Sequence, residues 1–141
     1  MPKYIIKDAV LVVNSVDLSS RVASVSVIME GDDVDVSTMG TGVHEHLTGL
    51  RNDRFEVTFL SDFDADMVDD TLFPLLADAD SQPEFAVYAQ PFSGAISTTN
   101  PRYSTDRAIL NTYQPIAGAV GARSEVTVTF FSNEAIDRAL S

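Results

Sequence analysis

Alternation between apolar and polar positions is the dominant pattern along the chain. In residues 54–60, Phe55, Val57 and Phe59 alternate with polar or charged neighbours. The same spacing of two recurs in residues 125–130 and in residues 24–29, where Met29 follows the valines. Successive side chains of a strand point to opposite faces, so each segment predicts a strand with one face in a core.

Four shorter segments also predict strands, because they are apolar or β-branched and are bounded by turn-forming residues. These segments are residues 4–6, 10–13, 85–89 and 108–113. The turn signals are Asn14-Ser15, Gly31-Asp32-Asp33, Asn100-Pro101, Gly118 and Gly121. The 141 residues therefore predict one mostly β domain, a β-sandwich or barrel of about seven or eight strands.

One segment, residues 66–77, has the spacing of a helix instead. Its apolar positions are Val68, Leu72, Leu75 and Leu76. Pro74 interrupts this stripe, since a proline inside a helix removes a hydrogen bond and clashes with the preceding turn. Either the helix is kinked, or it begins late with Thr71 as its N-cap. We expect one short α-helix that lies across an end of the sandwich.

Two long connections stand out, because structureless loops beyond about 12–15 residues are uncommon unless they are functional or mobile. The first, residues 31–52, is too apolar for a solvated loop. It is either an arm that docks on a neighbouring subunit or an extra hairpin packed on its own domain. The second covers residues 90–105 and contains Phe92. The candidate subunit-interface residues of these connections are Met39, Val43, Leu47, Leu50 and Phe92.

The C-terminal segment, residues 133–141, has Ile136 and Leu140 four positions apart, as on one face of a helical turn. Two interpretations stay open. The segment is a docking tail, which adds Ile136 and Leu140 to the candidate interface, or it is a frayed end.

The charge balance is strongly acidic, with 9 Lys and Arg against 21 Asp and Glu and a net charge of −12. Such a surface repels phosphate, so sequence-specific recognition of nucleic acid is not expected. No apolar run approaches the roughly 18 residues of a membrane helix. Lys7 and Asp8 break the apolar start, so we expect no signal peptide and synthesis in a cytoplasm.

The sequence gives little support to catalysis, a metal site or a cofactor. It has no cysteine, and its two histidines form the segment His44-Glu45-His46, where further metal ligands are missing. The segment from Asp62 to Asp66 begins like a calcium loop, but Met67 and Phe73 occupy the positions that need Gly and Glu. We expect surface or interface histidines, no catalytic residues, no metal and no cofactor.

Several short pieces, taken in order, resemble the tail tube proteins of long-tailed, non-contractile phages (siphophages). Together they cover nearly the full length of the chain. The pieces are residues 14–19 (NSVDLS), 33–40 (DVDVSTMG), 49–50 (GL), the strand 55–60, the helix 67–76, residues 100–103 (NPRY), residues 113–118 (YQPIAG) and the closing strand 126–131.

This resemblance implies a structural virion protein, made in a host cytoplasm and located in the tail. Such subunits form a β-sandwich flanked by a helix, and six of them join their sheets into a ring with an inner β-barrel. The rings stack into a hollow tube through which DNA is ejected without sequence-specific binding. The implied partners are other copies of the chain, the tape measure protein and the tail terminator, with no membrane. Residues 31–52 match the arm that reaches an adjacent ring.

Two other classes of function stay open. The chain could be another phage structural part, such as a tail terminator, a head–tail connector or a decoration protein. It could also be a β-sandwich module that binds carbohydrate or a cell surface. The acidity fits carboxylates that face the lumen and repel DNA, but it also fits adaptation to salt or GC-rich codon usage.

Overall fold

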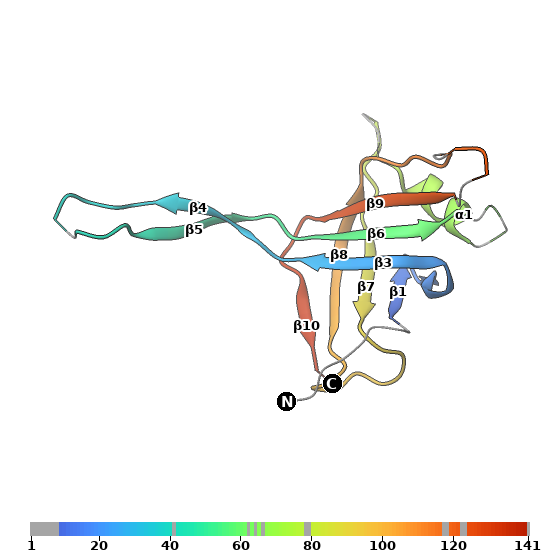
Figure 1. Cartoon of the computed structure of the whole chain (residues 1–141), viewed down its shortest axis with the longest axis horizontal. Helices are drawn as coiled ribbons and strands as arrows, with labels where there is room; N and C mark the ends of the chain where they lie inside the picture. The colour runs from blue at the N-terminus through green and yellow to red at the C-terminus, as the bar shows by residue number, and fades with distance from the viewer. Residues whose placement is uncertain are drawn as a thin grey trace.

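The computed structural model describes residues 9–140 apart from 41, 62, 64, 66, 78–79, 117–118 and 122–123. Its elements follow the chain in the order seen in Figure 1. They are β1 (Val10–Val13), β2 (Val16–Asp17), a 3-10 turn (Ser19–Arg21), β3 (Val22–Ile28), β4 (Gly31–Asp35), β5 (His46–Arg51), β6 (Arg54–Leu60), α1 (Val68–Leu72), a 3-10 turn (Phe73–Leu75), β7 (Phe85–Gln90), β8 (Arg102–Leu110), β9 (Glu125–Ser132) and β10 (Asp137–Ala139).

Eight strands form one antiparallel sheet that folds over on itself. The order is β2-β1-β7-β8-β9-β6-β3, with β10 paired to β8. The sheet bends at β8, because one edge of β8 pairs with β7 while the other is shared by β10 and β9. In Figure 1, β3, β6 and β9 run horizontally and cross the other layer, which contains β7 and β8. The predicted mostly β sandwich with one short helix is confirmed.

The core fills the space between the two layers, as the alternation predicted. Phe55, Phe59 and Phe130 are completely buried, and the ring of Phe130 meets that of Phe85 edge to face at 5.7 Å between centroids. Burying a side chain of this size contributes roughly 1.5–3 kcal/mol. Along β3 the pattern fails at its end: Met29 lies outside the strand and is 45% exposed, so the prediction that it lines the core was wrong.

The β1–β2 hairpin confirms the turn predicted at Asn14-Ser15. Val13 pairs with Val16, so the loop has only these two residues, and both have positive φ (49° and 67°). Such a two-residue turn matches the right-handed twist of the strands that it joins. It allows the apolar strand β1 to enter the core beside β7.

The helix is shorter than predicted and ends before the proline. α1 begins after Met67, and Pro74 lies in the 3-10 turn that follows. The late start at Thr71 was wrong, because Thr71 is inside α1 and its buried hydroxyl has no partner among the described residues. The buried stripe is Val68, Leu72 and Leu75, in agreement with the predicted helical spacing.

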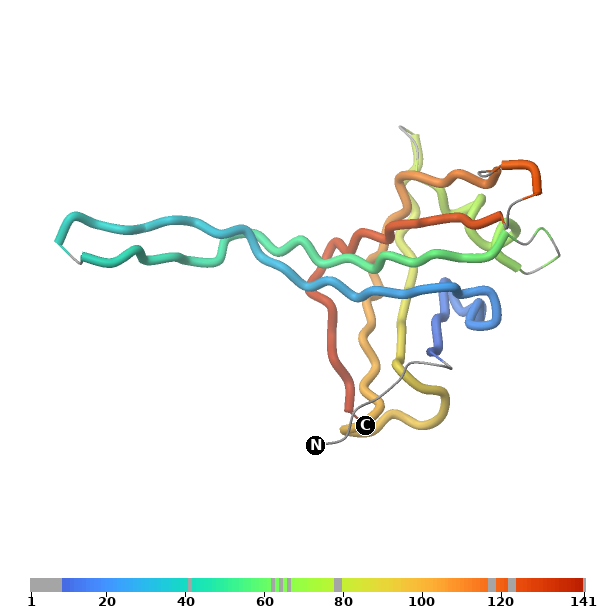
Figure 2. The backbone as a smooth tube through the Cα atoms, viewed as in Figure 1, coloured from blue at the N-terminus to red at the C-terminus, as the bar shows by residue number. Residues whose placement is uncertain are grey.

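Residues 31–52 form neither a loop nor a hairpin packed on its own domain. β4 and β5 pair as a separate two-stranded ribbon, here called the arm, which projects well away from the sandwich (Figure 2). The predicted loop of residues 90–105 is also shorter, because β7 continues to Gln90 and β8 begins at Arg102. The strand predicted at residues 108–113 is the end of β8, which stops at Leu110.

The C-terminal segment is a strand rather than a helical turn. β10 pairs with the start of β8, and Ile136, just before β10, is buried in the core. The prediction of a helical turn from Ile136 to Leu140 was therefore wrong, and so was the interpretation of the segment as a frayed end.

Other expectations fall where the structure gives no description. The strand at residues 4–6, the carboxylates of Asp62, Asp64 and Asp66, and Gly118 lie outside the described residues. Within the described residues, no helix is long and apolar enough to cross a membrane.

Candidate assembly surfaces

The arm carries an unusual number of exposed apolar side chains. The exposed fractions are 44% for Val34, 105% for Met39, 69% for Val43, 61% for Leu47 and 81% for Leu50. Four of these five were predicted from the sequence, and Val34 was missed, although the alternation of residues 33–36 would have revealed it. A group of apolar side chains in contact with solvent marks an interaction surface.

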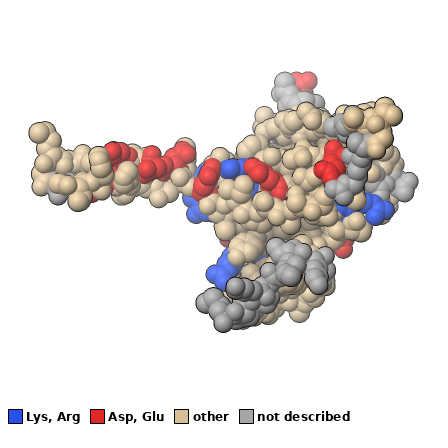
Figure 3. Space-filling model, viewed as in Figure 1, with Lys and Arg blue, Asp and Glu red and all other residues tan. Residues whose placement is uncertain are grey.

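The pairing of β4 with β5 gives the arm two different faces. Val34 lies opposite Leu47, so these two side chains share one face. On the other face, His46 Nδ1 is 2.9 Å from Asp33 Oδ1. Asp35 is also on this face, and hydrogen bonds from the hydroxyl and the backbone N–H of Ser37 hold its pKa below the usual range. Acidic side chains therefore gather along one edge of the arm in Figure 3.

The base of the arm is fixed to the sandwich by a buried carboxylate. Asp53 accepts hydrogen bonds from Arg51 Nε at 3.1 Å and Arg51 Nη2 at 2.9 Å. It also accepts the backbone N–H of Ile136 at 2.8 Å. Since Arg51 ends β5 and Ile136 precedes β10, this one side chain ties the arm to the C-terminal segment. The apolar alternation gave no signal of this role.

The outer face of β3, β6 and β9 is rich in hydroxyl groups. Thr58 lies between Ser24 and Thr127 in the ladder, and its hydroxyl is 3.3 Å from that of Thr127. In the next row, Glu56 lies between Ser26 and Thr129. Among the described residues of this face, the cation is Arg54, which pairs with Glu30 at 2.8 Å and with Glu56 at 3.2 Å. This face therefore offers hydroxyl and carboxylate groups and a neutralised guanidinium.

The sandwich is open along β3. Within the described residues β3 pairs only with β6, so its other edge keeps free backbone hydrogen-bonding groups. Val25 and Val27 face inward but are only half-buried. An exposed strand edge is a template for another strand.

The other predicted interface residues lie in different places. Phe92 is half-buried in the loop after β7, where its backbone N–H donates to Asn100 Oδ1. Ile136 is only 7% exposed and belongs to the core of its own chain, whereas Leu140 is 36% exposed. The structure therefore brings together the predicted residues of the arm but not Phe92, Ile136 and Leu140.

The histidines lie on the exposed arm. Their rings are 6.4 Å apart between centroids, with His44 near Asp35 and His46 near Asp33. Among the described residues, no three His, Cys, Asp or Glu side chains are arranged to hold a metal ion.

Solved structures share this fold. A chain of the PVC sheath–tube complex, an extracellular contractile injection system in its extended state, has a TM-score of 0.70 and 11% identity, with 99% of this chain and 93% of that chain covered. The sheath/tube terminator of PVC gives a TM-score of 0.68 and 9% identity over 99% and 98%. The tail of an empty gene transfer agent (GTA) particle gives 0.58 and 17% over 84% and 82%.

These similarities are structural only. No family model and no curated protein sequence matches the chain. At such low identity the likeness shows that the chain has the fold of tail tube subunits.

Proposed function

We propose that the chain is the tube subunit of a phage or phage-like tail, and that copies of it form rings that stack into a hollow conduit. The exposed apolar arm carries this proposal. An isolated domain gains nothing by holding Met39, Leu47 and Leu50 in water on a separate ribbon. Docking on another subunit would remove that apolar surface from solvent.

Ring formation is supported by the open edge of β3. Edge-to-edge joining between subunits would satisfy the free backbone groups of this strand. Because such joining uses two different surfaces of each copy, it closes into a ring when the rotation fits. We propose six copies in each ring, and the similar GTA tail has C6 symmetry.

We further propose that the hydroxyl-rich face of β3, β6 and β9 lines the conduit through which DNA is ejected. Glu56 and Glu125 add negative charge there, and Arg54 is neutralised by its two carboxylates. The described residues of this wall give phosphates no unpaired cation to bind, so we expect DNA to pass without sequence-specific contacts. The tape measure protein and the tail terminator are the other proposed partners.

The similar structures include a contractile injection system. We propose a non-contractile tail, as in siphophages, on the sequence resemblance alone.

A second candidate function is that of a tail terminator. The PVC sheath/tube terminator matches almost as well as the sheath–tube complex, with TM-scores of 0.68 and 0.70. A terminator forms one ring and stops, whereas a tube subunit polymerises.

The test of this function is a comparison of assembly before and after the arm is made polar. Leu47→Asp and Leu50→Asp should abolish stacking, while the free energy of unfolding of the monomer changes by no more than about 0.5 kcal/mol, because both side chains are exposed. A matched control is Thr48→Asp, on the polar face of the arm. Electron microscopy gives the state of assembly and urea unfolding gives the stability. Normal tubes from the Leu47→Asp and Leu50→Asp variants would overturn the proposed role of the arm.

A further inference from the structure

An apolar groove lies between β3 and the layer that contains β7 and β8. Its volume is about 390 Å³. Its main apolar lining comes from Val25, Val27, Met29, Ala89, Pro101 and Tyr103. The groove lies beneath the inward face of β3, which explains why Val25 and Val27 point inward and are still only half-buried. It is separate from the free backbone edge of β3, which is proposed above to join a neighbour in the ring.

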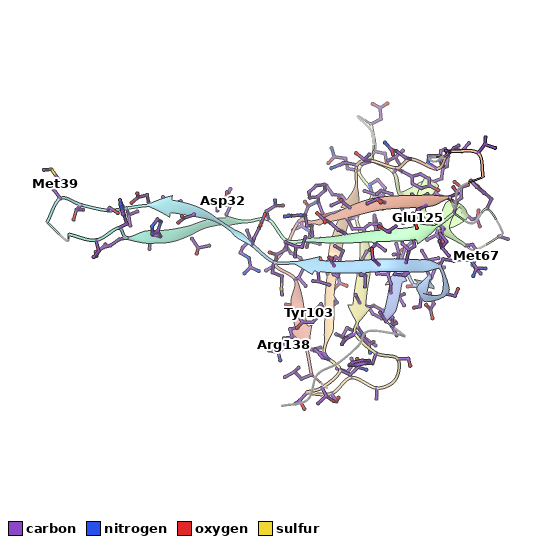
Figure 4. All side chains as sticks on the ribbon, viewed as in Figure 1. Asp32, Met39, Met67, Tyr103, Glu125 and Arg138 are labelled. Atoms are coloured by element: carbon purple, nitrogen blue, oxygen red, sulfur yellow. The ribbon has the colours of Figure 1, made fainter. Side chains whose placement is uncertain are left out.

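A positive charge lies beside Tyr103 of the groove lining. Tyr103 is directly opposite Ala89 on β7 and Arg138 on β10, so the three side chains share one face of the sheet. Figure 4 shows Tyr103 and Arg138 on these neighbouring strands. Arg138 is exposed, and no carboxylate of the described residues pairs with it.

The arm has the complementary chemistry. Residues 30–51 contain five carboxylates and a single lysine or arginine, which is Arg51. Arg51 is already paired with Asp53. Val34 and Leu47 supply an apolar face, and Asp32 is an exposed carboxylate for which the described residues provide no partner. The arm projects away from the sandwich of its own chain (Figure 1), so we infer that another copy brings an arm to the groove.

We propose that this groove receives the arm of a second copy of the chain, with Val34 and Leu47 against the groove lining and Asp32 paired with Arg138. This proposal rests on the tube function proposed above and names the surface that accepts the arm. The apolar contact supplies the driving force, because both partners leave water. The charge pair sets the register, since complementary charges at an interface favour one alignment over its neighbours.

Disulfide trapping tests this contact directly, because the chain has no cysteine of its own. One population carries Leu47→Cys, and a second, distinguished by a size tag, carries Tyr103→Cys. Oxidation of the mixed populations should give a mixed disulfide between the two. As a matched control, Thr127→Cys on the hydroxyl-rich face replaces Tyr103→Cys. A mixed disulfide that is no more abundant with Tyr103→Cys than with Thr127→Cys would overturn the proposal.

Electron microscopy of the same samples separates this proposal from the tube function. Tubes without the preferred disulfide would refute the groove as the docking surface and leave the tube function standing. The preferred disulfide without tubes would support the groove and count against the tube function. If neither tubes nor the preferred disulfide form, both the tube function and the groove as docking surface are refuted.

Charge reversal provides a second test that does not alter the groove lining. Arg138→Glu should raise the protein concentration needed for assembly about tenfold, since a like charge then faces the arm carboxylates. Adding Asp32→Arg to the same chain should restore assembly. Arg107→Glu, on β8 and paired with Glu84, is the control for the loss of an arginine. Equal effects of Arg138→Glu and Arg107→Glu, or no rescue by Asp32→Arg, would contradict the pairing.

Discussion

Replacement of Asp53 by alanine is the sharpest test of how the arm is held. The side chain of Asp53 is fully buried. It accepts three hydrogen bonds, two from the guanidinium of Arg51 and one from the backbone N–H of Ile136. Asp53→Ala removes both carboxylate oxygens and all three hydrogen bonds, while the backbone carbonyl of residue 53 still accepts the N–H of Ser132.

The expected loss follows from what each former partner can do next. The N–H of Ile136 is left without a partner in a buried position, which costs roughly 1–3 kcal/mol. The side chain of Arg51 is 48% exposed, so its guanidinium can bind water instead of Asp53. Loss of this ion pair therefore lowers the free energy of unfolding by only about 1 kcal/mol. We therefore expect Asp53→Ala to lower the free energy of unfolding by about 2–4 kcal/mol. Asp53→Asn keeps one acceptor oxygen, and its cost should be smaller.

Urea unfolding followed by circular dichroism measures this loss, and the chain has no tryptophan to report it by fluorescence. The midpoint should fall while the slope with urea stays constant. Asp32→Ala is the matched control, since it removes an exposed carboxylate of the same arm and should change stability by less than about 0.5 kcal/mol. A loss of stability in Asp53→Ala no larger than that in Asp32→Ala would refute this role of Asp53.

Three further predictions follow from individual side chains. Ile136→Ala should lower the free energy of unfolding by about 2–4 kcal/mol because Ile136 is in the core, while Leu140→Ala should have little effect in the same urea titration. Burial and a 2.8 Å hydrogen bond to Asp69 raise the pKa of Tyr113, so its contribution to stability is complete below about pH 10 and is lost as the pH rises further. Tyr113→Phe should lower the free energy of unfolding by about 1 kcal/mol near neutral pH, and thermal unfolding should show that the variant loses less stability than the original sequence as the pH rises above about 10. An equal loss of stability at alkaline pH in the two proteins would count against this role of Tyr113. Thr127→Lys places a cation on the hydroxyl-rich face, and assembled tubes of this variant should retain short DNA duplexes in co-sedimentation at low salt, unlike tubes of the original sequence.

Alternation predicted the strands that form the core. Phe55, Val57 and Phe59 on β6, and Val126, Val128 and Phe130 on β9, are buried as their spacing indicated. In these strands one face meets the core and the other does not, so the apolar positions in the sequence coincide with the buried positions in the structure.

The pattern failed where strands are held by something other than a buried face. β10 was missed because Ile136 lies before the strand and its spacing to Leu140 resembles a helical turn. In the arm, the apolar residues were recognised as interface candidates, but the ribbon was not, because neither of its faces is buried within the chain. The groove combines residues of β3, β7 and β8, and Arg138 reaches its neighbour Tyr103 through the pairing of β10 with β8, so both depend on strands that are far apart in the sequence.

The most direct test of the central claim is negative-stain electron microscopy of the purified chain, concentrated at moderate and at high salt. Hollow tubes of uniform width with six-fold rings are the predicted result, and they would exclude both a terminator and a monomeric binding module. Single rings that never stack would contradict the tube and favour the terminator. A chain that stays monomeric under all these conditions would contradict self-assembly through the arm.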